Sequence, residues 1–293
     1  MSTTNITQPD PSTQPDPSTR PDPAGRPSPG PQPGLTTQLA RNLEAEWIKL
    51  RSVRSTMISL LATAAVCIGF ADLLAFGVVN RWDRMGAQGQ ANFEPATFAV
   101  SGVLFGQLVI GALGALAMSA EYSTGTIRAT LSATPQRLVM YLSKIAVFTV
   151  TALAVAVVTT TVAFVTSQPI LAGKHIGTSF SAAGVPRVII GAGLFLVAVA
   201  LLGLGLAALL RHTAAAISTL FGLMLVMPLI LNFLPNDWQD RVSRWAPLNA
   251  GSAVMQVHPE SNMLAPWTGL AVLFGYAVIA LVLGAAVLLR RDA

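Results

Sequence analysis

The sequence predicts an all-α membrane protein with six transmembrane helices, an N-terminal interfacial helix and a disordered proline-rich tail. Three observations predict this fold. Hydrophobic residues make up 53% of the 293 residues and charged residues 11%, whereas soluble domains carry about 25% charged residues. Six apolar runs reach the roughly 20 residues that a helix needs to cross a bilayer. All five tryptophans lie at the ends of these runs, where amphipathic rings meet the lipid headgroups.

Residues 1–34 form a separate, proline-rich domain. A repeat of six residues, TQPDPS, begins at Thr7, and ten of the 19 prolines lie in this segment. Because it has little apolar surface to bury, we expect a disordered, polyproline-like cytoplasmic tail. The alternative is a ligand for a proline-binding domain.

Residues 35–56 are predicted to form an amphipathic interfacial helix. At 100° per residue its leucines, Trp47 and Val53 share one stripe, which Glu46 interrupts. This pattern is typical of a helix lying along a membrane surface with its basic residues towards the headgroups. The alternative is a simple flank of the next span. The candidate interfacial residues are Glu46, Trp47, Lys49, Leu50, Arg51 and Arg54.

The transmembrane domain is predicted to cover 57–293. Its spans are expected at about 57–79, 98–120, 145–167, 188–210, 213–234 and 267–289. Because Arg211 and His212 alone separate the fourth and fifth spans, these should form a tight antiparallel hairpin. The GxxxG spacing of Gly102 and Gly106 would allow another helix to approach the second span closely.

Lysine and arginine residues predict the orientation of the spans. With the N-terminus inside, the inner flanks hold ten of these residues and the outer flanks hold six. Positive residues accumulate on the cytoplasmic side of membrane proteins. We therefore expect a multi-pass protein of the bacterial cytoplasmic membrane with both termini in the cytoplasm.

Polar groups at bilayer depth are candidates for translocation. Asp72 lies in the first span and Gln107 in the second, and a charge at that depth is costly unless it is paired or hydrated. The alternative is that Asp72 marks a shorter first span, or pairs with Arg81 or Arg84.

The outer loop at 235–265 is expected to contain a short helix in the outer leaflet. Trp238, Val242 and Trp245 share one helical face, and Pro247 is expected to end the helix.

Several function classes are excluded by the sequence. The chain lacks the G-x-x-x-x-G-K-[ST] motif that binds nucleotide phosphates. All three histidines lie outside the spans, and the single cysteine, Cys67, cannot form an internal disulfide or a zinc site. Basic residues are scattered rather than grouped on one face, which argues against nucleic acid. We expect no catalytic activity, cofactor or metal on this chain.

The polar segment 121–137 separates the second and third spans. Glu121 precedes residues that favour a helix start, and Pro135 is expected to stop the helix. A helix of about ten residues is marginally stable alone in water. Ile127 and Leu131 could contact a partner surface, either the membrane or another protein.

Two stretches, "EWIKLRSVRST" (46–56) and "EYSTGTIRATLSATPQR" (121–137), resemble actinobacterial permeases of type-2 ABC transporters. The resemblance covers about residues 36–293. It implies that 121–137 is the coupling helix that docks on an ATPase subunit, and that short re-entrant helices lie between the fifth and sixth spans. The residues that match the coupling motif are Glu121, Gly125, Thr126, Ile127 and Arg128, and the further coupling candidates are Tyr122, Leu131 and Arg137.

The implied function is that of a permease subunit of an ATP-driven exporter. ATP and Mg would bind on a separate ATPase subunit, and the chain would pair with a second copy or a sister permease within membrane lipid. The alternatives are an ion-coupled secondary transporter that uses Asp72, and a non-transporting membrane anchor or sensor subunit.

Overall fold

The computed structural model describes residues 35–123, 137–233, 235, 239 and 241–290. The chain divides into two units, residues 1–38 and 39–293. In the first unit, residues 35–38 are described, and the account below concerns the second. The proline-rich tail and most of the predicted coupling segment therefore lie outside the described residues.

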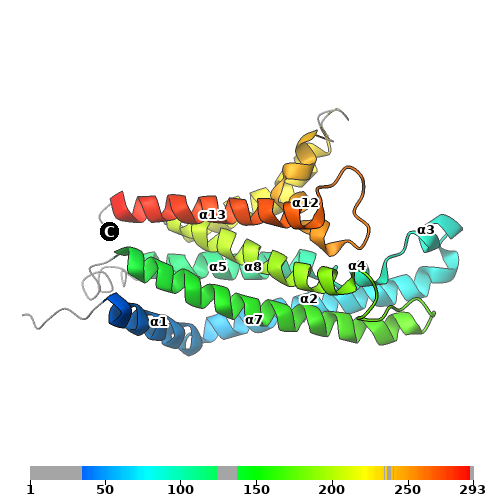
Figure 1. The fold of residues 1–293 in the computed structure, drawn as a ribbon, viewed down its shortest axis with the longest axis horizontal. Helices are drawn as coiled ribbons and strands as arrows, with labels where there is room; N and C mark the ends of the chain where they lie inside the picture. Colours follow the sequence, from blue (N-terminus) through cyan, green and yellow to red (C-terminus); the bar gives the residue numbers. More distant parts are fainter. Residues whose placement is uncertain (1–34, 124–136, 234, 236–238, 240, 291–293) are drawn as a thin grey trace, which may run out of the picture. The chain divides into compact units, whose positions relative to one another are not determined.

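The described chain is helical and contains six helices that are long and apolar enough to cross a membrane, as the sequence predicts (Figure 1). Helix α1 (Leu35–Ser52) precedes them. The spanning elements are α2 (Arg54–Arg81), α4 (Pro95–Ala99) with α5 (Val103–Ser123), α7 (Arg137–Ala172), α8 (Val185–Leu210), α9 (Thr213–Phe221) with η4 (Gly222–Val226) and α10 (Met227–Leu231), and α13 (Pro266–Arg290). Shorter elements are η3 (Trp82–Arg84), α3 (Ala87–Ala91), η5 (Ser243–Trp245), α12 (Pro247–Ser252) and η6 (Ala253–Met255).

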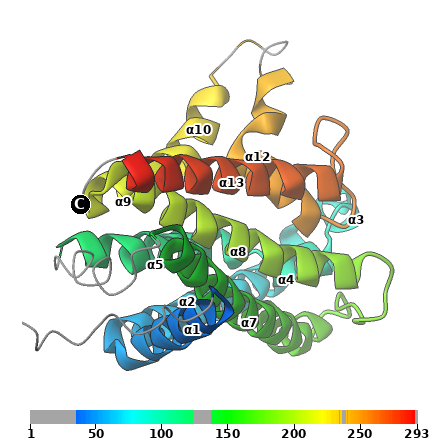
Figure 2. The ribbon, with the colours of Figure 1, turned by 60° about the vertical axis from the view of Figure 1, so that its left-hand side comes forward.

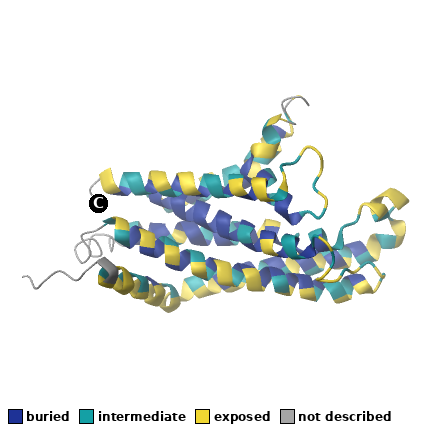
Figure 3. Ribbon diagram, in the orientation of Figure 1, coloured by how far each residue is buried: buried dark blue, intermediate teal, exposed yellow. Residues whose placement is uncertain are grey.

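Helix α8 forms the core of the second unit. It packs against α5, α7 and α13, while α2 packs against α5 and α7. Most residues of α8 are buried, whereas the other spans each have one exposed face (Figure 3). Those faces carry large apolar side chains such as Leu61 and Val150. Such surfaces are costly in water and suit contact with lipid chains.

Small residues allow the helices to approach closely. A Cβ atom at Gly102 or Gly106 would collide with Cys67 of α2, so these two glycines bring α2 and α5 together. The same holds where α5 crosses α8, because a Cβ at Gly203 would collide with the carbonyl oxygen of Gly111. Small residues at membrane helix contacts let backbones pack at short range.

Two predicted spans are not continuous α-helices. The second is interrupted at residues 100–102, immediately before the close contact of Gly102 with α2. The fifth contains a π-helical turn, η4, just before Pro228. Since proline lacks an N–H group, it cannot donate the hydrogen bond that a regular α-helix would need there.

The tight turn between the fourth and fifth spans depends on two residues. Arg211 adopts a left-handed backbone conformation with φ of 54° and ends α8. The His212 side chain then accepts a hydrogen bond from the backbone N–H of Ala215 and begins α9. Helix α9 packs back against α8.

The loop between the fifth and sixth spans contains short helical segments before and after Ala246. Residues 241–242 are helical, and η5 ends at Trp245, before the non-helical Ala246. Pro247 then lies in the first turn of α12, a position that tolerates its missing N–H. Helices α12 and η6 are largely buried and pack against α13, and η6 also packs against α8 (Figure 2). Trp238 lies outside the described residues, Val242 is half-buried and Trp245 is exposed. The buried short helices α12 and η6 therefore follow the segment 238–245, and they lie between the fifth and sixth spans, where the resemblance implies short helices.

Candidate functional site

Four charged side chains from three helices meet where α5 leads into residues 124–136. Lys144 of α7 forms ion pairs with Glu46 of α1 at 2.6 Å and with Glu121 of α5 at 2.9 Å. Lys49 of α1 pairs with the same carboxylates at 2.7 and 3.2 Å. We call these four residues the charge cluster. They form a closed network in which each lysine contacts both glutamates.

The charge cluster is mostly buried. Glu46, Glu121 and Lys144 are buried, while the side chain of Lys49 is 45% exposed. Buried charges are stable only when they are paired, and removing one partner of a buried pair typically costs about 3–5 kcal/mol. With two acids and two bases, the cluster is formally neutral. This balance permits four charges to share one site at the border of an apolar bundle.

The pKa values of the α1 members follow from these contacts. Burial by itself would raise the pKa of the Glu46 carboxyl, but Lys144 and Lys49 outweigh burial and lower this pKa below its ordinary value. Burial by itself would lower the pKa of the Lys49 ammonium, but its hydrogen bond with Glu46 and the charge of Glu121 raise it. Both groups therefore hold their charges more firmly than they would in water.

The cluster links both ends of the predicted coupling segment. Glu121 lies in the last turn of α5, and Lys144 lies seven residues after Arg137, the first residue of α7. Seven residues correspond to about 10 Å along a helix. Because α1 supplies the other two charges, the cluster joins α1 to the end of α5 and to α7.

A second set of contacts ties this end of the bundle to α13. Arg137 donates a hydrogen bond to the Leu288 carbonyl oxygen at 3.2 Å, and Arg211 donates one to that of Val287 at 3.0 Å. The Arg211 guanidinium also lies over the Tyr122 ring, 5.5 Å from its centroid. Two predicted coupling residues, Tyr122 and Arg137, thus lie in one network that reaches the last span.

The other predicted residues of the coupling segment, Gly125, Thr126, Ile127, Arg128 and Leu131, lie outside the described residues. In α1, Lys49 is exposed and pairs with Glu46 and Glu121. Glu46, which interrupts the apolar stripe of α1, is buried and pairs with Lys49 and Lys144. Trp47 is exposed and Leu50 is half-buried, while Arg51 and Arg54 are exposed.

The two translocation candidates make separate local contacts. Asp72 is half-buried and accepts a hydrogen bond from the Thr166 hydroxyl of α7 at 3.0 Å. The Arg81 guanidinium donates to the carbonyl oxygen of Gly77, one turn before it. Gln107 is buried and donates to the Leu104 carbonyl oxygen. These contacts do not join Asp72 and Gln107 into one site.

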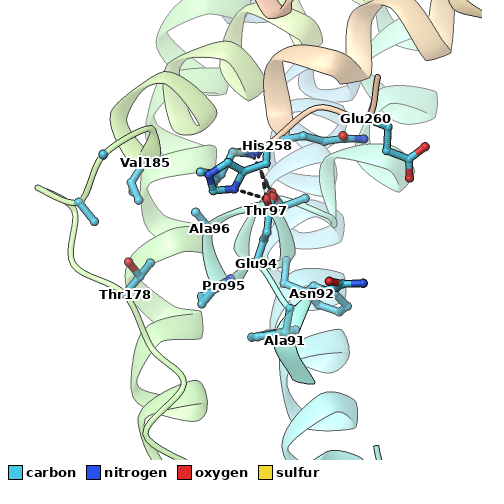
Figure 4. Close-up of a pocket in the computed structure, with 16 residues that line it drawn as sticks. Ala91, Asn92, Glu94, Pro95, Ala96, Thr97, Thr178, Val185, His258 and Glu260 are labelled. Atoms are coloured by element: carbon cyan, nitrogen blue, oxygen red, sulfur yellow. Dashed lines mark hydrogen bonds and ion pairs between the residues drawn. The ribbon is translucent and has the colours of Figure 1, made fainter. Parts of the chain in front are cut away.

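At the opposite end of the bundle, a cavity of about 690 Å³ lies beside the start of α4 (Figure 4). Glu94 organises one wall of it. Its carboxylate accepts hydrogen bonds from the backbone N–H groups of Val257 and His258, at 3.0 and 2.9 Å, and from the Thr97 hydroxyl. The His258 ring also lies 2.8 Å from this carboxylate. Glu94 therefore fixes the backbone of the loop before α13.

Arg187 holds the same loop from α8. Its guanidinium donates hydrogen bonds to the carbonyl oxygens of Gln256 and Val257 at 2.9 and 2.8 Å. Burial by itself would raise the pKa of the Glu94 carboxyl, but its hydrogen bonds with Thr97, His258 and the two amides lower it. We call Glu94, Arg187 and His258 the outer latch, because they join α4 and α8 to the loop that follows η6.

Sequence reasoning did not find Lys144 or the outer latch as functional candidates. Lys144 and Arg187 lie just before apolar runs, where a basic residue is usually explained by membrane topology. The signal that could have located Lys144 is the presence of two acids, Glu46 and Glu121, at the same predicted membrane border. Two acids at one border indicate that a buried cation pairs with both. No local pattern indicates that Glu94 and His258, separated by 164 residues, would meet.

The chain was compared with known proteins. No curated protein matches it. A family model described as "ABC-2 family transporter protein" matches residues 42–235, which is more than half of the chain. The match starts within α1, includes the whole charge cluster and ends after α10. The chain therefore belongs to the ABC-2 family of transporter proteins.

Proposed function

We propose that this permease is the membrane-spanning subunit of an ATP-driven exporter, coupled to a separate ATPase subunit that binds ATP and Mg. ABC-2 permeases typically work with an ATPase subunit. On this proposal the chain itself has no catalytic activity and binds no cofactor. Residues 121–137 dock on the ATPase, and the chain pairs with a second copy or a sister permease.

The charge cluster is the observation that carries this proposal. A segment that transmits force must be attached to elements that move with it. Glu121 and Lys144 flank residues 124–136 and pair with each other at 2.9 Å, and both also pair with α1. Paired buried charges resist separation, so the ends of the coupling segment and α1 would move as one body.

The orientation supports the same proposal. Helix α1 and the end of α13 lie at the same end of the helical bundle (Figure 1), as six spans require. The excess of lysine and arginine on the segments at that end favours the cytoplasm. The ATPase would then meet α1, the end of α5 and the start of α7 from the cytoplasmic side.

The outward direction and a lipophilic cargo remain parts of the proposal. The outward direction is proposed from the resemblance of residues 46–56 and 121–137 to permeases of type-2 ABC transporters. The described spans carry few polar groups at bilayer depth, and Asp72 and Gln107 bond within their own surroundings. Such spans favour an apolar or lipid-linked compound over an ion.

The test is to co-express the chain with candidate ABC ATPase subunits and to measure co-purification and ATP hydrolysis in nanodiscs. Glu46→Gln should uncouple the two subunits, so that ATP hydrolysis no longer responds to the permease, because it breaks the pairs of α1 with both lysines. Glu44→Gln is the matched control, since Glu44 is an exposed acid on the same helix.

Failure to co-purify with any ATPase would contradict the proposal and favour the membrane anchor. Transport without an ATPase that is abolished by Asp72→Asn would instead favour the ion-coupled alternative. Equal coupling in Glu46→Gln and Glu44→Gln would show that the charge cluster does not transmit the motion.

A further inference from the structure

An apolar groove lies directly beside the charge cluster. Its volume is about 390 Å³, and α1, α2, α5 and α7 all contribute to its walls. The four cluster residues form its polar part. Its apolar walls include Leu50, Leu113, Leu116 and Phe148. A site with a charged end and an apolar body suits an amphiphilic molecule.

One oxygen of the cluster lacks a partner among the described residues. Glu121 is buried, and its Oε1 atom accepts from both Lys49 and Lys144, but its Oε2 atom is buried without a hydrogen bond. A buried charged oxygen that is left unpaired is costly. In contrast, both oxygens of Glu46 are paired, Oε1 with Lys49 and Oε2 with Lys144. Glu121 Oε2 is therefore available to a hydrogen-bond donor that enters the groove.

Lys49 provides the complementary charge. An ammonium group has three N–H donors, and the described contacts of Lys49 use two acceptors, Glu46 Oε1 and Glu121 Oε1. Its side chain is also the exposed member of the cluster. Lys49 can therefore bind an anion at the edge of the groove while Glu121 binds a cationic donor inside it.

We propose that this groove binds a phospholipid with a primary-amine headgroup, of the phosphatidylethanolamine type. The lipid ammonium donates to Glu121 Oε2, the phosphate lies against Lys49, and an acyl chain lies along Leu113, Leu116 and Phe148. A choline headgroup cannot replace it, because a quaternary ammonium has no N–H to donate. This proposal goes beyond the transport function and does not depend on an ATPase.

The lipid would act at the junction of α1, α5 and α7. By pairing with Glu121 it would complete the charge cluster without disturbing the lysine contacts. Three hydroxyl residues in the first two turns of α2, Ser55, Thr56 and Ser59, also line the groove. They add polar donors on the α2 wall.

The test uses the full-length chain, purified in detergent and supplied with equal amounts of phosphatidylethanolamine and phosphatidylcholine that carry identical acyl chains. Retained lipid is counted by native mass spectrometry. The wild-type chain should retain the ethanolamine lipid preferentially. Glu121→Gln should reduce this preference about tenfold, the effect of losing one charge-assisted hydrogen bond.

A second variant tests the groove without touching the ions. Leu116→Trp should fill the groove and abolish the preference, whereas Val278→Trp, an exposed position on α13, should leave it unchanged. Water-soluble phosphoethanolamine should not compete, because it lacks acyl chains. Equal retention of both lipids by the wild type, an unchanged preference in Leu116→Trp, or full competition by phosphoethanolamine would each overturn the proposal.

Discussion

At the scale of single residues, Lys144 forms buried ion pairs that no local pattern in the sequence predicts. Its ammonium is the buried partner of two carboxylates, Glu46 and Glu121. Lys49 is too exposed to replace it fully. The stability of this end of the bundle should therefore depend on Lys144 far more than on the exposed lysines of the chain.

We expect Lys144→Met to lower the free energy of unfolding by about 3–5 kcal/mol, because two buried carboxylates lose a shared partner. Thermal or denaturant unfolding of the full chain in detergent measures this change. Lys174→Met is the matched control, since Lys174 pairs with the exposed carboxylate of Asp83. Exposed pairs contribute about 0–1 kcal/mol. Equal losses in the two variants would contradict the assigned role of Lys144.

The residue scale also shows what sequence reasoning can and cannot locate. The sequence places Glu121 at the start of the predicted coupling segment, and in the structure its carboxylate pairs within the chain. Residues 46 and 121 lie in different helices, and 98 residues separate Glu46 from Lys144. Helical periodicity shows which residues share one face of a helix. It does not give the neighbour that the face meets.

At the scale of elements, the spans were predictable because length and hydropathy determine them. The breaks within spans were not, because they follow from contacts between helices. Helix α5 begins after Gly102, where the backbone meets α2, and the π-turn η4 precedes Pro228. The resemblance implies short helices between the fifth and sixth spans, but helical periodicity does not give the bounds of α12, because its small residues Ala250 and Gly251 pack at close range into the core.

Glycines at helix crossings should therefore differ sharply from other helical glycines. We expect Gly203→Ala to destabilise the chain, because its Cβ would collide with the Gly111 carbonyl of α5. Gly275→Ala on α13 should be neutral or stabilise by up to about 1 kcal/mol, because no atom lies within 4 Å of the added Cβ. Melting temperatures of the two variants provide the comparison. A smaller loss for Gly203→Ala than for Gly275→Ala would refute the proposed crossing.

The hydrogen bonds of Glu94 in the outer latch predict how the loop before α13 responds to a substitution. Glu94→Gln should weaken the hold on residues 256–258, because an amide accepts the two backbone N–H groups less strongly than a carboxylate does. Hydrogen exchange of the amides of Val257 and His258 should accelerate about tenfold. Glu260→Gln, at a neighbouring acid that also lines the cavity, is the control. Unchanged exchange in Glu94→Gln would exclude a latch.

At the scale of the whole molecule, the two ends of the bundle have different electrostatic characters. The end that contains α1 is held by a closed network of two acids and two bases. The end that contains α4 is held by Glu94, Arg187 and a histidine ring. Because the charge cluster consists of carboxylates and ammonium groups, its contribution to stability should be independent of pH in the range in which histidine titrates.

The sign of each pKa shift defines this range. The pKa of Glu46 is lowered from its ordinary value of 4.5, so its contribution is complete above pH 4.5 and is lost as pH falls through the lower folded value. The pKa of Lys49 is raised from 10.5, so its contribution is complete below pH 10.5 and is lost as pH rises through the higher folded value. Between these limits Glu46 and Lys49 should contribute a constant stability.

The measurable consequence is a constant difference between wild type and Glu46→Gln. We expect Glu46→Gln to lower the melting temperature of the full chain in detergent by the same amount from about pH 5.5 to pH 9.5. Below pH 4.5 the difference should shrink, because the wild-type carboxyl then becomes protonated. Glu44→Gln should show no difference at any pH in this range. A difference that halves between pH 6 and pH 8 would place the folded pKa of Glu46 near neutrality and would contradict its pairing with Lys144 and Lys49.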